Sequence, residues 1–164
     1  MRTTIVFIIL LTISFQSCDE NCTSDRYEYK LFENSQINHV VGAPMQSHLF
    51  NIEEGNKLVA QYMLDRAECK DIMDDEYTEY IAFEIPNSAN ITSFEWTDQE
   101  LEEVNAYFYP TGAWWGGVYF PLEKGTIRGT KISANEWEIS IDIESPATDW
   151  GNTFTVNTRG RFRN

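Results

Sequence analysis

Hydrophobic and polar positions alternate most clearly in the last third of the chain. Between residues 137 and 144, one tryptophan and three isoleucines alternate with charged or polar residues. This period of two is typical of a strand that buries one of its faces. A Thr/Ile-rich run over residues 125–132 precedes it, and apolar residues between 154 and 162 follow it after a turn-rich segment. The pattern predicts a three-stranded antiparallel meander.

Shorter apolar runs predict further strands along the rest of the chain. They cover residues 57–64, 78–85, 91–96 and 118–120, with weaker signals near 37–41 and 48–52. The sequence Thr97-Asp-Gln-Glu100 has the spacing of a capping box, which predicts a short helix over residues 98–104. About seven or eight short strands with one short helix are typical of an antiparallel β-sandwich or small barrel, so we predict a mainly β fold.

The beginning of the chain has the character of a signal peptide. Arg2 is followed by an eleven-residue apolar stretch, residues 5–15. A membrane-spanning helix needs about 20 apolar residues, whereas the apolar core of a secretory signal has about this length. We therefore predict a signal peptide at residues 1–17, an anchor and short tether at residues 18–24, and a single β-rich domain at residues 25–164.

The end of this apolar stretch carries a family resemblance. A small residue stands directly before a cysteine in Phe15-Gln-Ser-Cys18, and Asp-Glu follows. The sequence resembles a bacterial lipobox, with Phe15 in place of the usual leucine, and is similar to small Bacteroidota outer-membrane or surface lipoproteins. The hairpin formed by residues 124–132 and 137–143 also looks like theirs, without implying any chemistry. The resemblance implies an acylated Cys18 in the outer membrane, at the cell surface or facing the periplasm. The alternative is an ordinary signal peptide beside an incidental thiol.

Two further cysteines, Cys22 and Cys69, remain when Cys18 is assigned to the lipid anchor. An even number of cysteines in an oxidising compartment predicts one disulfide bond. Its loop would stabilise the fold by about 4 kcal/mol in the chain-entropy description. The alternative is a pair of free buried thiols, because sequence spacing alone does not show that two cysteines are close.

The charge of the chain is strongly acidic. Lys and Arg number 12 against 26 Asp and Glu, which gives a formal net charge of -14. Nucleic-acid binding needs a basic face, so we predict no nucleic-acid partner. Asp71, Asp74, Asp75 and Glu76 gather in one segment, but they lack the glycine and the alternating ligands of a calcium loop. We interpret this segment as a solvated connection and expect no metal site.

The sequence contains no motif that indicates catalysis or a cofactor. His39 and His48 are nine residues apart, without the spacing of an HExxH zinc site. Ser47 beside His48 is only an adjacency, since a nucleophilic serine needs a base placed by the fold. Among 26 acidic residues some close carboxylate pair is expected by abundance alone. We therefore expect a non-catalytic protein without a cofactor.

An aromatic cluster is the strongest functional signal. Tyr107, Tyr109, Trp114 and Trp115 surround a Pro-Thr-Gly-Ala segment, and two glycines follow. Flat aromatic faces stack well on sugar C–H surfaces, and Tyr and Trp are common at protein-binding hot spots. The alternative is that the tryptophans close one end of the hydrophobic core, where most large aromatic residues lie.

These features predict a lipid-anchored protein of the cell envelope that binds a glycan or a protein and contacts the membrane through acylated Cys18. Two other classes stay open. One is an immunity or inhibitor lipoprotein that captures a basic toxin or enzyme through its negative charge. The other is a small hydrolase, which no sequence motif supports.

Overall fold

A computed structural model describes residues 22–40, 49–69, 72–73, 75–86, 90–112, 119–145 and 153–164. Within these ranges the chain forms ten β-strands and one four-residue α-helix. The mainly β fold with one short helix is therefore confirmed, and the strands outnumber the seven or eight expected. The predicted meander is also confirmed as three consecutive antiparallel strands, β8 (Lys124–Ser133), β9 (Glu136–Glu144) and β10 (Thr155–Arg163).

The bounds of the elements follow chain order. The strands are β1 (Arg26–Val40), β2 (Leu49–Glu54), β3 (Lys57–Asp65), β4 (Tyr77–Ile85), β5 (Ser93–Thr97), β6 (Tyr107–Gly112), β7 (Phe120–Pro121), β8 (Lys124–Ser133), β9 (Glu136–Glu144) and β10 (Thr155–Arg163). The helix α1 (Glu100–Glu103) lies between β5 and β6.

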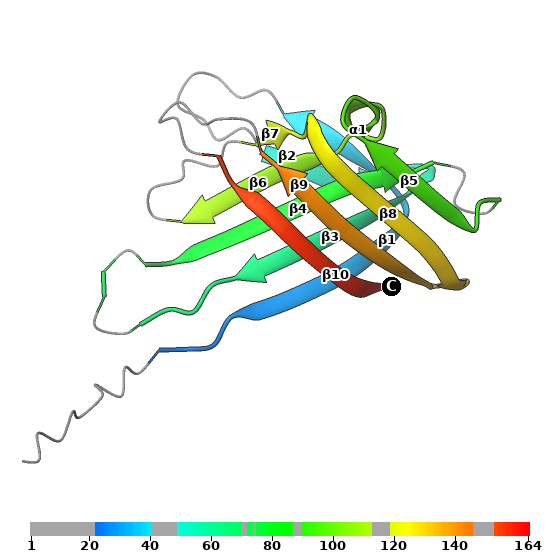
Figure 1. The fold of residues 1–164 in the computed structure, drawn as a ribbon. Helices are drawn as coiled ribbons and strands as arrows, with labels where there is room; N and C mark the ends of the chain where they lie inside the picture. Colours follow the sequence, from blue (N-terminus) through cyan, green and yellow to red (C-terminus); the bar gives the residue numbers. More distant parts are fainter. Residues whose placement is uncertain are drawn as a thin grey trace, which may run out of the picture.

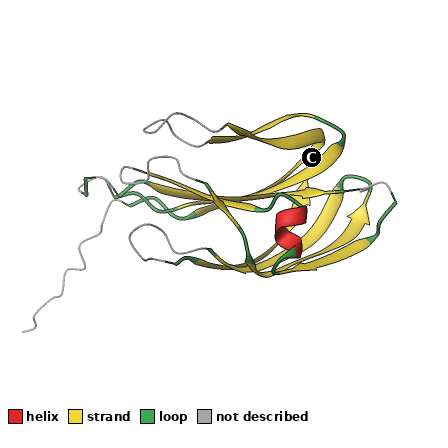
Figure 2. Ribbon diagram, turned by 90° about the horizontal axis from the view of Figure 1, so that it is seen from above, coloured by secondary structure: helices red, strands yellow, loops and turns green. Residues whose placement is uncertain are grey.

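The strands form one curled sheet in the order β5-β8-β9-β10-β1-β3-β4-β6-β7, with β2 paired to β1 (Figure 1). Neighbouring strands are antiparallel apart from β1 and β10, which run parallel with Lys30 in register with Arg163. The curl folds the sheet into layers that lie over one another (Figure 2). The arrangement is consistent with the predicted sandwich or small barrel.

The main hydrophobic core lies between the β5-β8-β9-β10 part of the sheet and the β1-β3-β4-β6 part. The predicted alternation is confirmed on β9, where Trp137, Ile139, Ile141 and Ile143 are at most 1% exposed. Leu101 of α1 is fully buried in the same core, so the helix covers one margin of the space between the layers (Figure 2).

The strand β1 bends, and its second half leaves the main layer. Its register with β3 shifts between residues 32 and 35. Asn34 has φ 50° there, a conformation that asparagine adopts more readily than most residues. Beyond the bend β1 pairs with β2, and Ile37 packs on Val59 and Ala82. The described parts of the two weak strand signals, residues 37–40 and 49–52, thus belong to a hairpin that covers the outer face of β3 and β4.

The short helix begins later than predicted and has a different cap. Glu100 reaches back as expected, and its Oε2 accepts hydrogen bonds from Thr97 N at 2.9 Å and Thr97 Oγ1 at 3.1 Å. The threonine hydroxyl therefore bonds to a carboxylate and does not cap a backbone amide. Gln99 occupies the N-cap position without a side-chain cap, and the capping-box prediction is correct only for the glutamate.

Cys22 and Cys69 form a disulfide bond, as predicted. Two hydrogen bonds join the residues next to these cysteines. Thr23 N donates to Glu68 O at 2.8 Å, and Glu68 N donates to Thr23 Oγ1 at 2.9 Å. The chain that enters β1 is therefore fastened to the connection between β3 and β4. The predicted signal peptide and Cys18 lie outside the described residues. In the part of the chain that the structure describes, no helix has the length and apolar character needed to cross a membrane.

Candidate functional site

Tyr107 and Tyr109 lie on β6 and face away from the main core. The residue between them, Phe108, is fully buried in that core, so alternation turns both tyrosines to the outer face of the sheet. Tyr109 is in register with Tyr80 of β4, and their ring centroids are 5.9 Å apart. The rings of Tyr107 and Tyr119 are nearly perpendicular, with centroids 5.3 Å apart. We call these four tyrosines, 80, 107, 109 and 119, the tyrosine strip.

The four residues of the tyrosine strip are half-buried, and Tyr107 also packs against the hydrophobic cluster of Ile37, Val59 and Ala82. Burial, with a smaller effect of the neighbouring Tyr119, raises the pKa of Tyr107. Burial, followed by the neighbouring Tyr80, likewise raises the pKa of Tyr109. Both hydroxyls therefore stay protonated at neutral pH, and a protonated phenol both donates and accepts hydrogen bonds.

Polar side chains continue the same face beyond the strip. Thr78 and Thr111 are in register across β4 and β6, and Thr78 Oγ1 donates to Asp65 Oδ1 at 2.9 Å. Arg26 Nη2 lies 3.2 Å from Asp65 Oδ2. The outer face thus combines aromatic rings with groups that donate and accept hydrogen bonds, a combination typical of ligand sites.

Several of the residues that the sequence singled out lie outside the part of the chain that the structure describes. Trp114 and Trp115 lie outside the described residues, as do His48, Asp71 and Asp74. Within the described ranges, no three His, Cys, Asp or Glu side chains gather closely enough to hold a metal ion. One member of the acidic segment has a structural contact, because Asp75 Oδ2 accepts a hydrogen bond from Cys69 N at 2.7 Å.

A buried carboxylate that the sequence analysis missed lies on the core face of β4. Glu79 shares this face with Ile81 and Phe83 and is only 5% exposed. Burial raises the pKa of Glu79, against the opposing effects of a hydrogen bond from Tyr77 and the positive charge of Arg66. The Tyr77 hydroxyl donates to Glu79 Oε2 at 3.2 Å. The sequence held one signal for this residue: Glu79 stands at a position where the alternation of β4 calls for an apolar side chain.

Glu79 lines a depression of about 170 Å³ at one end of the space between the layers. Tyr62 and Arg66 line it with the first residues of β10. Of the described residues around it, Glu79 alone carries a carboxylate. The pair of carboxyl groups that most glycoside hydrolases place on either side of the bond is therefore not found among the described residues that line this depression.

A second buried carboxylate, Glu84, lies on the outer face beneath the β1–β2 hairpin and is 2% exposed. It accepts hydrogen bonds from Lys57 Nζ at 2.5 Å, Asn105 Nδ2 at 2.6 Å and the Ile37 N–H at 2.9 Å. Burial acts to raise the pKa of Glu84, but these hydrogen bonds outweigh it and the pKa is lowered. Glu84 of β4 therefore stabilises the packing of the β1–β2 hairpin on the sheet.

No protein-family model, curated protein or solved structure matches the chain. Sequence patterning found Tyr107 and Tyr109 but missed Tyr80 and Tyr119, because strand pairing, which brings these rings together, is not visible in a local pattern.

Proposed function

We propose that this protein is a non-catalytic glycan-binding module of the cell envelope, with the tyrosine strip as its binding face. The proposal depends on one observation above all. Four half-buried tyrosine rings, contributed by β4, β6 and the residue before β7, lie on one outer face of the sheet. Polar side chains of Thr78, Thr111 and Asp65 adjoin them.

The tyrosine strip and its polar neighbours are complementary to the surface of a sugar. A sugar ring presents apolar C–H groups on its faces and hydroxyl groups around its edge. The tyrosine rings supply flat apolar faces, and the phenol, threonine and carboxylate oxygens supply hydrogen-bond partners. The tilted pair Tyr80 and Tyr109, with centroids 5.9 Å apart, forms a platform that one sugar ring can span.

We further propose that Cys18 is acylated and holds the protein on the outer membrane. This proposal rests on the resemblance of the segment before Cys18 to a lipobox. Each buried methylene contributes about 0.8 kcal/mol, so several acyl chains give a long-lived attachment. Cys22 follows after four residues, which span at most about 14 Å, so the disulfide-bonded body would lie close to the membrane.

A glycan array with the full-length protein in detergent tests the binding proposal. We expect the double variant Tyr80→Ala/Tyr109→Ala to lose about tenfold or more in affinity for glycans that the native protein binds, because two stacking faces are removed. Replacing the same two residues with phenylalanine keeps the stacking faces and should retain part of the affinity.

Tyr27→Ala provides the matched control, since Tyr27 is 51% exposed and lies outside the strip. It should bind glycans as the native protein does. The proposal fails if no glycan binds, or if the strip variants bind normally while their melting temperatures match that of the control.

The net charge of -14 supports a second candidate, an inhibitor that captures a basic protein. Charge complementarity mainly accelerates association, and salt screens it. Capture of a basic protein that weakens steeply with salt and is indifferent to Tyr80→Ala/Tyr109→Ala would favour this candidate over glycan binding.

A further inference from the structure

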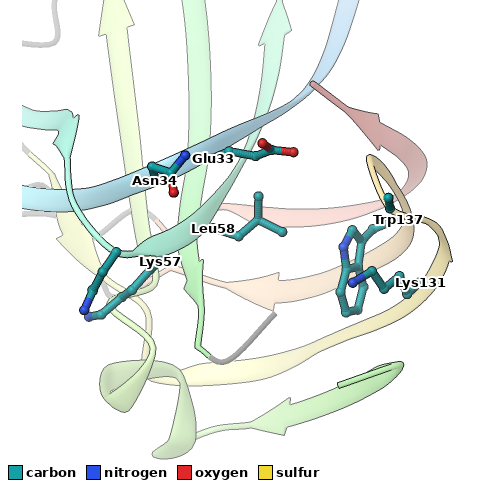
Figure 3. Close-up of a pocket in the computed structure, with 8 residues that line it drawn as sticks. Glu33, Asn34, Lys57, Leu58, Lys131 and Trp137 are labelled. Carbon is teal, nitrogen blue, oxygen red and sulfur yellow. The ribbon is translucent and has the colours of Figure 1, made fainter. Parts of the chain in front are cut away.

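A depression of about 310 Å³ lies between the turn that joins β8 to β9 and the bend of β1 (Figure 3). Trp137 and Lys131 form one wall of it. Glu33 and Asn34 approach from the bend of β1, and Leu58 lies between the two walls. Side chains from both layers of the main core therefore meet around one open space.

The indole N–H of Trp137 is a hydrogen-bond donor without an acceptor at this place. The side chain is fully buried, and its Nε1 has no hydrogen-bond partner among the residues that the structure describes. Figure 3 shows the indole nitrogen on the side of the ring that faces Leu58 and the open space. Buried polar groups in native proteins are almost always hydrogen-bonded. The position therefore favours an acceptor that enters from the depression, and because Nε1 is closed to solvent, such an acceptor reaches it when the side chains around the depression move apart.

Lys131 places a positive charge over the face of the same indole ring. It is in register with Trp137 across β8 and β9, and its Nζ lies 5.7 Å from the centroid of the indole ring. The indole N–H points along the edge of the ring, whereas the ammonium lies over its face. A group with two acceptor oxygens, such as a carboxylate, can therefore contact both, with one oxygen at each donor. Hydrogen bonds from an ammonium to an anionic oxygen are the strong ones, which favours a negatively charged acceptor.

Glu33 narrows the choice of anion. Its carboxylate lies on the wall opposite Lys131, and the second lysine that lines the depression, Lys57, is already paired with Glu84. Glu33 therefore disfavours a dianion such as phosphate, and it can accept a hydrogen bond from an N–H group of a ligand. Leu58 supplies apolar surface between the two polar walls. A ligand that fits these walls has one carboxylate, a neighbouring N–H group and a small apolar part.

We propose that this depression, which we call the Trp137 site, binds a small carboxylate of the amino-acid or peptide-terminus class. The ligand's carboxylate accepts hydrogen bonds from Trp137 Nε1 and Lys131 Nζ, and its N–H group faces Glu33. The Trp137 site uses none of the residues of the tyrosine strip. It is therefore independent of glycan binding.

Nuclear magnetic resonance of the ¹⁵N-labelled full-length protein in detergent tests this proposal. The indole N–H signal of Trp137 is identified by its loss in Trp137→Phe. N-acetylleucine serves as the probe, and N-acetylleucine amide as its uncharged counterpart. We expect the acid to shift the Trp137 signal saturably and to bind about tenfold more tightly than the amide, because only the acid makes charge-assisted hydrogen bonds.

Two lysines on β8 give a matched pair of variants. Lys131→Met should weaken binding of the acid about tenfold. Lys124→Met changes a lysine at the other end of the strand, 3.5 Å from Glu144, and should bind as the native protein does. Ala134 also lines the depression, so Ala134→Phe places a large side chain in it and should abolish binding. This variant and Lys131→Met test the proposal if Trp137→Phe fails to fold.

The proposal is overturned if the acid leaves the Trp137 signal unmoved. It is equally overturned if the acid and the amide bind alike, or if Lys131→Met binds the acid as tightly as Lys124→Met. Normal binding by a folded Ala134→Phe variant would place the ligand elsewhere and have the same consequence.

Discussion

Glu79 and Glu84 belong to the same strand, but they lie on opposite faces and their carboxyl groups are perturbed in opposite directions. Glu79 faces the main core, where burial raises its pKa. Glu84 faces the covering hairpin, where hydrogen bonds from Lys57, Ile37 and Asn105 overcome the effect of burial and lower its pKa. Successive side chains of a strand point to opposite faces, so two residues that are five positions apart lie on different faces.

Glu79→Gln is expected to be more stable than the native protein at neutral pH. A raised pKa in the folded state means that folding favours the protonated form. That contribution is fully present below the ordinary pKa of 4.5 and is lost as the pH rises through the raised value. Urea unfolding from pH 4 to pH 8 measures the difference, which should grow with pH. A constant difference would show that Glu79 has no raised pKa.

Glu84→Gln is expected to be less stable by about 2 kcal/mol at neutral pH, because hydrogen bonds to a charged group are lost in a buried place. The lowered pKa gives stability that is present above the ordinary value of 4.5 and is lost as the pH falls through the folded-state value. The deficit should therefore shrink in acid. The two glutamine variants control for each other, and the prediction is wrong if they shift the free energy of unfolding in the same direction.

At the scale of elements, the meander was predictable because its information is local. On β9 a period of two runs from Trp137 to Ile143, and each inward residue is buried. The strand β1 shows no such continuous alternation, because its bend at Asn34 moves its second half to another layer. Its two halves therefore face different surroundings, and no single period describes the whole strand.

The strand β6 was missed for a different reason. It contains Pro110, which lacks a backbone N–H and is rare inside sheets. The structure accommodates this proline because β7 pairs only with Tyr107 and Phe108, so β6 has no described neighbour on that side at Pro110. The candidate site was also only partly predictable. Tyr109 was visible in the local sequence pattern, whereas its contact with Tyr80 depends on the register between β4 and β6.

Removal of the disulfide should destabilise the fold strongly. The bond links residues 47 positions apart, and a loop of this length stabilises by about 4 kcal/mol in the chain-entropy description. We expect the double variant Cys22→Ser/Cys69→Ser to lose about this much free energy of unfolding in urea. The native protein unfolded with a reductant provides the control and should match the variant. An unchanged free energy would show that hydrogen bonds of Thr23 suffice to hold this segment.

At the scale of the whole molecule, Cys18→Ser tests the proposed attachment. The variant lacks the thiol that would carry acyl chains, so it should leave the detergent phase for the aqueous phase in a partition experiment. Mass spectrometry should find acyl groups on the native protein and none on the variant. Tyr27→Ala, which keeps Cys18, should partition as the native protein does. A native protein that is water-soluble and unmodified at Cys18 would contradict the envelope proposal.

The bond between Cys22 and Cys69 has a mechanical consequence for a molecule held by its N-terminal side. A pulling force that arrives at Cys22 divides between the chain leading into β1 and the connection that follows β3. These two strands are antiparallel and continuously paired from Arg26 with Asp65 to Phe32 with Val59. Because the load reaches their adjacent ends together, it cannot peel β1 away from β3 one hydrogen bond at a time.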